Sequence, residues 1–239
     1  MMNLAIQSTA SALLLAPLAA QALQPLTSDD TGTQGAGRWQ VEAGVAHNGA
    51  RQRQWNVTLT RGLAEPLDLY IQAPYTHHGN FGSGWNDTGL GLKWRLAEQG
   101  PFSLAVKPEI SLPIGDGQRG LGTGRAGASA TLLAQWKTGP FILLANAALV
   151  HQPNWQGDRR TIWQFSGAAL YRVSGQLQLA LDAALARNPT PSAATPPAFL
   201  IAAAIYAPRP WLDLSLGYRH GLNRPSDYHA IMLGLTARW

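Results

Sequence analysis

The feature that most constrains the fold of this 239-residue chain is a repeated pattern of short segments in which apolar residues alternate with small or polar ones. In one of them, Leu67, Leu69 and Ile71 alternate with Asp68 and Tyr70. Successive side chains of a β-strand point to opposite faces, so this period of two predicts strands. Twelve such segments follow one another. Each has about ten residues, the length of a tilted strand that crosses a membrane.

The connections between these segments are alternately short and long. The short ones are 63–66, 97–101, 137–140, 173–175 and 208–210. The others are mostly longer and rich in Gly, Pro and Asn: 50–53, 77–84, 115–124, 152–160 and 188–197. Outer-membrane barrels combine short periplasmic turns, longer external loops and an even number of strands. The pattern therefore predicts an all-β, transmembrane, antiparallel up-and-down β-barrel of twelve strands, with both termini on the short-turn side.

Aromatic residues mark both ends of the predicted strands. Those beside the short turns are Trp39, Trp94, Phe102, Trp136, Phe141, Tyr171, Trp211 and Trp239. Those toward the long loops are Trp55, Tyr75, Trp155, Trp163, Tyr218 and Tyr228. Two aromatic belts around an aliphatic band are typical of a membrane barrel, because amphipathic rings favour the interface. The strands of a soluble β-sandwich or lipocalin-like barrel would also alternate apolar and polar residues, but no physical effect would favour aromatic belts at both strand ends there.

The other face of the predicted strands carries ionisable groups. We predict that the following residues line the pore: Glu42, Asp68, Lys93, Arg95, Lys107, Glu109, Arg125, Asp182, Asp213 and Arg219. Buried charge is costly, so this face would make a poor soluble core, whereas it suits a wetted lumen. Most of the cations come from neighbouring strands, and Asp182 and Asp213 come from strands roughly opposite. We therefore expect an electric field across the lumen.

The N-terminus resembles a secretory signal. An apolar run from Ala12 to Ala20 precedes an Ala-Gln-Ala cleavage pattern that ends at Ala22;. We therefore expect a signal peptide at 1–22, a periplasmic N-terminal segment at 23–37 and an outer-membrane barrel at 38–239. The run Ser28-Asp29-Asp30-Thr31-Gly32 is open to three interpretations: a turn-rich tail, a contact with the lumen wall or a small cation site.

Composition excludes other classes of protein. Charged residues make up 13% of the chain and cysteine is absent, so no disulfide or thiolate chemistry is available;. The net charge of +5 comes from scattered Lys and Arg with no run of four. The aromatic residues also lack an RNA-binding pattern, so nucleic acid is not an expected partner. We expect no cofactor.

The last predicted strand runs to the C-terminal Trp239. Chain ends fray unless a sheet holds them. We therefore expect this strand to pair with the first strand, which would close the barrel and remove its edges. Trp239 would then lie in the periplasmic aromatic belt. A last strand that ends in an aromatic residue also resembles the signal that the outer-membrane assembly machinery recognises.

Three stretches together resemble one family. They are QPLTSDDTGTQGAGRWQVEAG (24–44), NDTGLGLKWRL (86–96) and ISLPIGDGQRGLGTGRAGASATLL (110–133). In this order, and across most of the chain after the predicted signal peptide, the sequence resembles the outer-membrane transporters of the "MetA-pathway of phenol degradation" family. The resemblance implies passage of aromatic or other hydrophobic compounds.

Histidines lie at the long-loop ends of the predicted strands. Those that continue the outward face form a predicted outer rim: His47, His77, His151, His220 and His229. Three interpretations stay open: contact with lipopolysaccharide headgroups, a pH-sensitive rim, or a metal site if the rings converge. The strands that close the barrel would make His220, His229 and His47 near neighbours.

These features predict an outer-membrane channel of a Gram-negative bacterium for passive uptake of small molecules, including hydrophobic or aromatic ones. Its expected partners are membrane lipid, lipopolysaccharide, the assembly machinery and a small-molecule solute. A structural or adhesive barrel without a transport role is the alternative. A lipid hydrolase is a third class, but the sequence has no GxSxG motif;. We therefore do not expect an enzyme.

Overall fold

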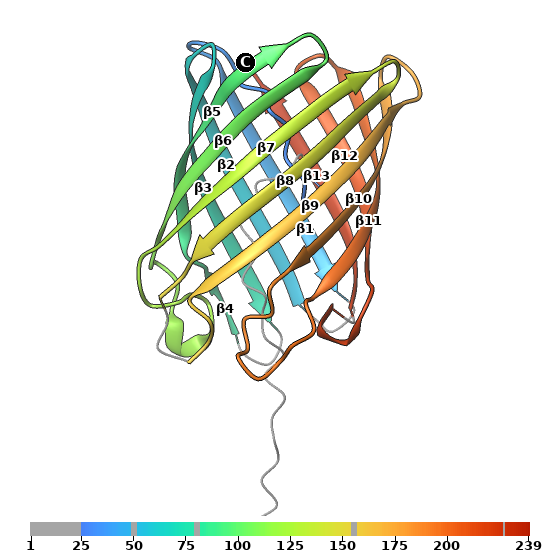
Figure 1. Cartoon of the computed structure of the whole chain (residues 1–239). Coiled ribbons are helices and arrows are strands. Elements are labelled where there is room, and N and C mark those ends of the chain that lie inside the picture. The colour runs from blue at the N-terminus through green and yellow to red at the C-terminus, as the bar shows by residue number, and fades with distance from the viewer. Residues whose placement is uncertain (1–24, 49–51, 79–81, 154–156, 227) are drawn as a thin grey trace, which may run out of the picture.

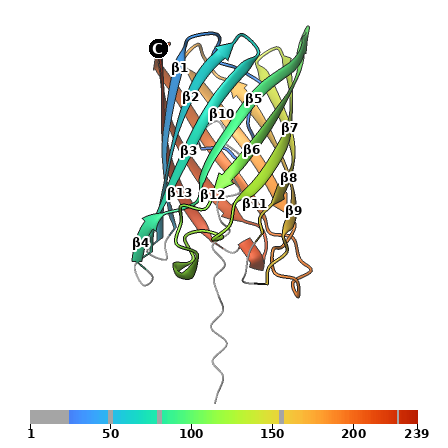
Figure 2. The ribbon, with the colours of Figure 1, turned by 90° about the vertical axis from the view of Figure 1, so that its left-hand side faces the viewer.

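The protein is a closed antiparallel β-barrel (Figures 1 and 2). The computed structural model describes residues 25–48, 52–78, 82–153, 157–226 and 228–239. The predicted signal peptide lies outside these residues. The wall consists of β1 (Trp39–Asn48), β2 (Gln52–Ala64), β3 (Leu67–His78), β5 (Thr88–Gln99), β6 (Phe102–Leu112), β7 (Gly127–Thr138), β8 (Phe141–His151), β9 (Thr161–Arg172), β10 (Leu177–Ala186), β11 (Ala198–Arg209), β12 (Leu212–Gly221) and β13 (His229–Arg238). The prediction of twelve wall strands is confirmed.

A thirteenth, short strand does not belong to the wall. β4 (Gly82–Trp85) pairs only with the last residues of β3, on the long-loop side. Two 3-10 turns, η1 (Gly117–Arg119) and η2 (Arg224–Ser226), also lie in the long loops. Figure 1 shows the short turns at one end of the barrel, with the C-terminus, and the long loops at the other. Among the described residues, no helix is long and apolar enough to cross a membrane.

The first and last strands close the barrel, as predicted. β1 pairs with β2 on one side and with β13 on the other, where Gln40 lies opposite Arg238. The Trp39 N–H donates to the Trp239 carbonyl oxygen at 2.8 Å, and the Trp239 N–H donates back to Trp39 at 3.1 Å. The C-terminal residue is therefore held in the ladder, because every backbone group at this seam needs a partner inside a membrane.

The outer face is apolar and carries aromatic residues near both ends. Exposed aliphatic side chains such as Leu132, Leu181 and Leu233 cover the wall. At the short-turn end, the ring centroids of Phe141 and Tyr171 lie 5.1 Å apart. The predicted belts have one exception: Tyr228 contacts the lumen residue Arg219 and does not belong to the outward belt. Trp155 lies outside the described residues.

Candidate functional site in the barrel lumen

The segment that precedes β1 lies inside the barrel. Residues 25–37 run from the middle of the lumen to the short-turn mouth, where β1 begins. Of our three interpretations of residues 28–32, a contact with the lumen wall is the one that the structure shows. The described part of the N-terminal segment predicted at 23–37 therefore lies within the barrel, at its periplasmic side. The reason is that the inner wall offers these polar residues matched partners, which water outside the barrel would otherwise supply.

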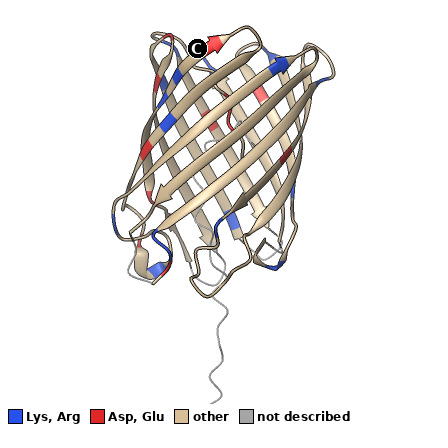
Figure 3. Ribbon diagram, viewed as in Figure 1, with Lys and Arg blue, Asp and Glu red and all other residues tan. Residues whose placement is uncertain are grey.

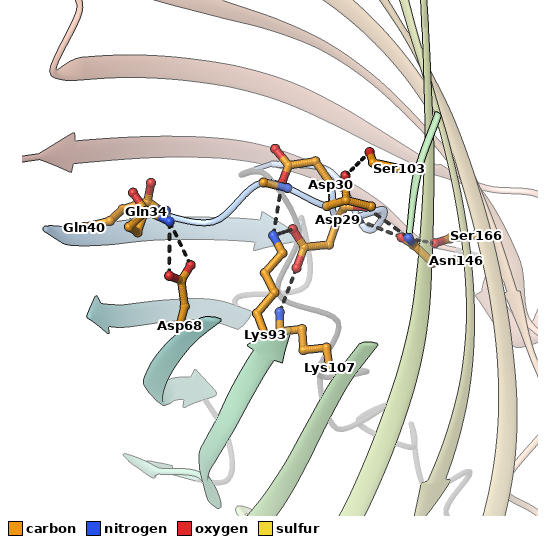
Figure 4. A network of polar contacts seen from close by, with 12 residues as sticks. Asp29, Asp30, Gln34, Gln40, Asp68, Lys93, Ser103, Lys107, Asn146 and Ser166 are labelled. Atoms are coloured by element: carbon orange, nitrogen blue, oxygen red, sulfur yellow. Dashed lines mark hydrogen bonds and ion pairs between the residues drawn. The ribbon is translucent and has the colours of Figure 1, made fainter. Parts of the chain in front are cut away.

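The N-terminal segment contacts strands on opposite sides of the lumen. The Ser28 N–H and hydroxyl donate to the Asp182 carboxylate on β10 at 3.0 and 2.8 Å. The Thr27 N–H donates to the same carboxylate. Toward the other side, the Gln34 N–H donates to both oxygens of Asp68 on β3 at 3.1 Å. The segment therefore crosses the lumen (Figure 4).

A buried ionic cluster lies in the middle of the N-terminal segment. Lys93 on β5 donates to Asp29 at 2.9 Å and to Asp30 at 3.0 Å, and Lys107 on β6 donates to Asp29 at 2.8 Å. From β8, two strands along the wall from β6, the Asn146 side chain accepts the Asp29 N–H at 2.7 Å and donates to the Asp29 carbonyl oxygen at 3.0 Å. Asp29 is thus bonded through both its side chain and its backbone (Figure 4).

The pKa of the Asp29 carboxyl lies below its ordinary value. Burial is the largest single influence and acts to raise the pKa, but the Lys107 and Lys93 ammonium groups together outweigh it by charge and by hydrogen bonding;. Asp29 is therefore ionised at neutral pH, and the cluster is a set of charge-assisted hydrogen bonds.

A second polar cluster surrounds Glu109 on β6. The Tyr70 hydroxyl donates to Glu109 at 3.1 Å and the Gln72 amide donates to it at 2.9 Å. Both come from β3, so their side chains reach across β5. Gly89 and Gly91 on β5 make this possible, because a β-carbon at Gly91 would lie 2.3 Å from the Tyr70 hydroxyl oxygen;.

The inner wall of β8 to β11 carries most of the buried apolar side chains of the lumen. Its side chains form a buried cluster with Leu26 of the N-terminal segment: Leu144, Ala168, Leu170, Ala180, Ala184, Phe199, Ile201, Ala203 and Ile205. Figure 3 shows β8 and β9 almost without charged residues. The lumen is therefore divided into a charged half and an apolar half, with the N-terminal segment between them.

Two cavities lie at the short-turn mouth, on either side of Asp30. The larger, of about 530 Å³, is lined by charged and polar side chains that include Glu42, Asp68 and Lys93, with Trp39 and Trp239 at its edge. The smaller, of about 230 Å³, lies against Leu144, Leu170 and Ile205 of the apolar half. A small solute would meet two chemically different recesses at this mouth.

Most of the predicted pore residues lie in the lumen. Asp68, Lys107, Glu109 and Asp182 are buried there, Lys93 is nearly buried, and Glu42 lines the larger cavity. Three others lie nearer to the ends of the strands: Arg95 and Asp213 near the short-turn end, and Arg219 near the long-loop end. Arg125 was placed wrongly. It precedes β7 in an exposed loop, because the Gly-rich stretch delays the start of that strand to Gly127.

The expected field across the lumen is largely cancelled. Asp29 and Asp30 neutralise the ammonium groups of Lys93 and Lys107 at close range. At the short-turn end, Arg238 pairs with Asp213 at 2.8 Å and Arg95 pairs with Glu98 at 3.2 Å. The field prediction treated the wall charges alone and left out the acidic residues of the N-terminal segment, which only the fold brings between them.

Sequence reasoning missed several lumen residues. Tyr70, Gln72, Asn146 and Phe199 were not assigned to the site, and Arg238 was not recognised as the partner of Asp213. The alternation does place Tyr70 on the same face as Asp68, and the glycine pair Gly89 and Gly91 signals that a large side chain passes over β5.

Asp87 joins the two Gly-rich motifs of the long loops. Its carboxylate accepts the Gly115 N–H at 3.1 Å, the Thr123 N–H at 2.8 Å and the Thr123 hydroxyl at 3.0 Å. A β-carbon at Gly122 would lie 2.2 Å from this carboxylate. The motifs at 86–89 and 112–124 therefore form one folded unit at the rim.

The predicted rim histidines do not form one cluster. The Nδ1 atoms of His220 and His229 lie 3.1 Å apart, and the Tyr218 hydroxyl lies 3.1 Å from His229 Nδ1. His47 faces Ile231 in the β1–β13 register, and His77 and His151 contact Ser83 and Thr161. In the described part of the chain, no group of three or more His, Cys, Asp or Glu residues could hold a metal ion.

No protein-family model matches this sequence, and no curated protein matches it. Solved structures do. The COG4313 outer membrane channel from Pseudomonas putida F1 matches with a TM-score of 0.70 at 12% identity, over 88% of this chain and 98% of that chain. The NanC porin matches with a TM-score of 0.60 at 11% identity, and the KdgM porin with 0.61 at 7%, each over 83% of this chain and 98% of the other.

Sequence identities as low as these show that the chains share a fold and do not show a shared function. The fold is that of the outer-membrane porins and channels of Gram-negative bacteria, and it agrees with the apolar outer face and its aromatic ends. The protein is therefore an outer-membrane β-barrel in a lipid environment.

Proposed function

We propose that this barrel is an outer-membrane channel for the passive passage of small solutes, with hydrophobic or aromatic compounds as the class it favours. The observation that carries the proposal is the division of the lumen. The N-terminal segment separates a charged wall from an apolar wall, and a recess lies on each side of it. A filled structural barrel would need neither recess.

We also propose that the chain belongs to the outer-membrane transporters of the "MetA-pathway of phenol degradation" family. Three motifs support this proposal. Residues 24–44 supply the segment in the lumen, and the other two motifs meet at Asp87. Two sequence motifs that contact each other in the fold identify a family more specifically than two separate Gly-rich motifs would. The likeness to the Pseudomonas putida F1 outer membrane channel agrees with this assignment.

Lipopolysaccharide and the assembly machinery remain proposed partners. The exposed rim histidines His151, His220 and His229 suit a headgroup layer, and the exposed Trp239 ends the last strand. The comparisons favour a channel over an enzyme, because the three solved structures described above are porins and a channel.

Single-channel recording of the refolded chain in a planar bilayer tests the channel proposal. We expect small steady conductance in potassium chloride, reduced by added phenols or aromatic acids that occupy the recesses. A variant without residues 25–37 should conduct more, because the segment crosses the lumen. A folded barrel that conducts in neither form would favour the structural or adhesive alternative.

A further inference from the structure

One lumen cation differs from all the others. Lys93 and Lys107 pair with Asp29, Arg238 pairs with Asp213, and Arg95 pairs with Glu98. Arg219 on β12 makes no hydrogen bond or ion pair with any of the residues that the structure describes, and its Nε atom is buried without a partner. A charged group withdrawn from water without an opposite charge is costly, so such a group within a membrane protein indicates a functional site.

The surroundings of Arg219 are aromatic and apolar. Its guanidinium carbon lies 3.5 Å from the ring centroid of Phe199 and 4.6 Å from that of Tyr228. Phe199 is 3% exposed and belongs to the apolar half of the lumen. Contact with ring faces stabilises the guanidinium, but its N–H groups lie at its edge and still need acceptors.

The nearest carboxylate on the same wall is already occupied. In the sheet register, Asp182, Ile201 and Arg219 lie opposite one another on β10, β11 and β12. Two strand spacings separate Asp182 from Arg219 by about 10 Å, well beyond hydrogen-bond reach. The buried Ile201 lies between them, and the Asp182 oxygens accept from Thr27 and Ser28.

Arg219 also lies where an incoming solute would arrive first. It is two residues from the end of β12, on the long-loop side, and its neighbour Tyr228 lies just before β13 on the same side. The short-turn mouth with its two cavities is at the other end of the barrel. The cation is therefore near the external entrance of the lumen.

We propose that Arg219, with Phe199 and Tyr228, is a binding site for a small monocarboxylate with an aromatic or apolar body, at the external end of the lumen. The guanidinium fork matches a carboxylate, which accepts two parallel N–H bonds. The two rings and Ile201 then contact the apolar body. One cation neutralises one negative charge, so the site does not favour a dianion such as phosphate. This inference rests on the proposed channel function and narrows its solute class.

Calorimetric titration of the refolded chain in detergent tests the site directly. Benzoate is the probe, benzyl alcohol is its uncharged counterpart and inorganic phosphate is the dianion. We expect benzoate to bind more tightly than benzyl alcohol, and phosphate not to compete. Equal binding of benzoate and benzyl alcohol would overturn the proposal.

Variants separate the cation from the rings. Arg219→Gln should weaken benzoate binding at least about tenfold, because a charge-assisted pair is lost, and should leave benzyl alcohol unchanged. Tyr228→Leu should weaken benzoate by about twofold to tenfold. Arg125→Gln, an equal charge change in the exposed loop, is the matched control. Heat-modifiable electrophoretic mobility reports folding of each variant. Unchanged benzoate binding in folded Arg219→Gln would refute the site.

The two proposals fail in distinguishable ways. Conductance in potassium chloride tests the channel and does not depend on Arg219 binding a carboxylate. A barrel that conducts but does not prefer benzoate removes the site and leaves the channel. A barrel that prefers benzoate through Arg219 but never conducts keeps the site and removes the channel.

Discussion

The two halves of the lumen hold the same N-terminal segment by different physics. On β5 and β6 the segment is held by Lys93 and Lys107, whose charges pair with Asp29. On β8 to β11 it is held by packing around Leu26, with one carboxylate, Asp182, which accepts from the backbone of the segment. Charge pairs require both partners, whereas apolar contacts weaken gradually as atoms are removed. The charged half should therefore be the more sensitive to single substitutions and to pH.

The largest effect should follow from Asp29→Asn. This change keeps the shape but removes the negative charge that pairs with both Lys93 and Lys107, and the Lys107 side chain is only 5% exposed. We expect the free energy of unfolding to fall by about 3 to 5 kcal/mol, measured by urea titration in lipid vesicles, and the conductance to rise. Asp30→Asn is the control: Asp30 is more exposed and pairs only with Lys93. An equal loss in both variants would contradict the central role of Asp29.

Acid should reproduce part of this effect. The Asp29 carboxyl has a folded pKa below its unfolded value of 3.8, so its stabilising contribution is present above pH 3.8 and is lost as the pH falls through the folded pKa;. Conductance should stay constant from neutral pH down to about the unfolded pKa of 3.8 and should rise at lower pH. Asp29→Asn should lack that rise. A rise near pH 6 would point to other groups.

In the apolar half, Leu26→Ala should cost less. Leu26 is 5% exposed, and its truncation leaves a cavity against the wall of β8 to β11 that should lower the free energy of unfolding by about 2 to 3 kcal/mol;. The acid-induced conductance step should persist in this variant, because the ionic cluster is intact. If Leu26→Ala abolished the acid step, the two halves would not be independent.

Gly91→Ala tests the crowded crossing over β5. The added β-carbon would lie 2.3 Å from the Tyr70 hydroxyl and 2.7 Å from the Pro108 carbonyl oxygen. Overpacking of this kind should cost about 1 to 2 kcal/mol. Gly175→Ala is the matched control, because a β-carbon there meets nothing within 4 Å. Thermal unfolding of the two variants can be compared by electrophoretic mobility. Equal unfolding midpoints would argue against a close contact between the Tyr70 side chain and β5.

The smallest effect is expected at the short-turn mouth. The Arg238 and Asp213 side chains are 32% and 20% exposed, so solvent screens their ion pair;. Arg238→Gln should change the free energy of unfolding by less than about 1 kcal/mol. The same urea titration measures this change. If Arg238→Gln lowered the free energy of unfolding as much as Asp29→Asn, solvent exposure would not determine how much each ion pair contributes to stability.

Much of the wall can be predicted from the sequence, because a strand side chain has only two directions. The alternation of Leu69 with Asp68 and Tyr70 places every second residue in the lumen whatever the partner strand is. Arg125 shows where this reasoning ends. Alternation locates a face only inside a strand, and the exact start of β7 depends on how the preceding loop folds around Asp87.

The sequence by itself determined the number of strands, the two faces of the wall and the closure by the last strand, because these follow from a local period of two and from the need to pair every backbone group in a membrane. Only the tertiary structure decided that Asp29 meets Lys93 and Lys107, that Asp182 accepts from Ser28 and that Arg219 has no ion-pair partner among the described residues. These contacts join residues far apart in the chain, and no local pattern encodes which wall charge meets which partner across a lumen.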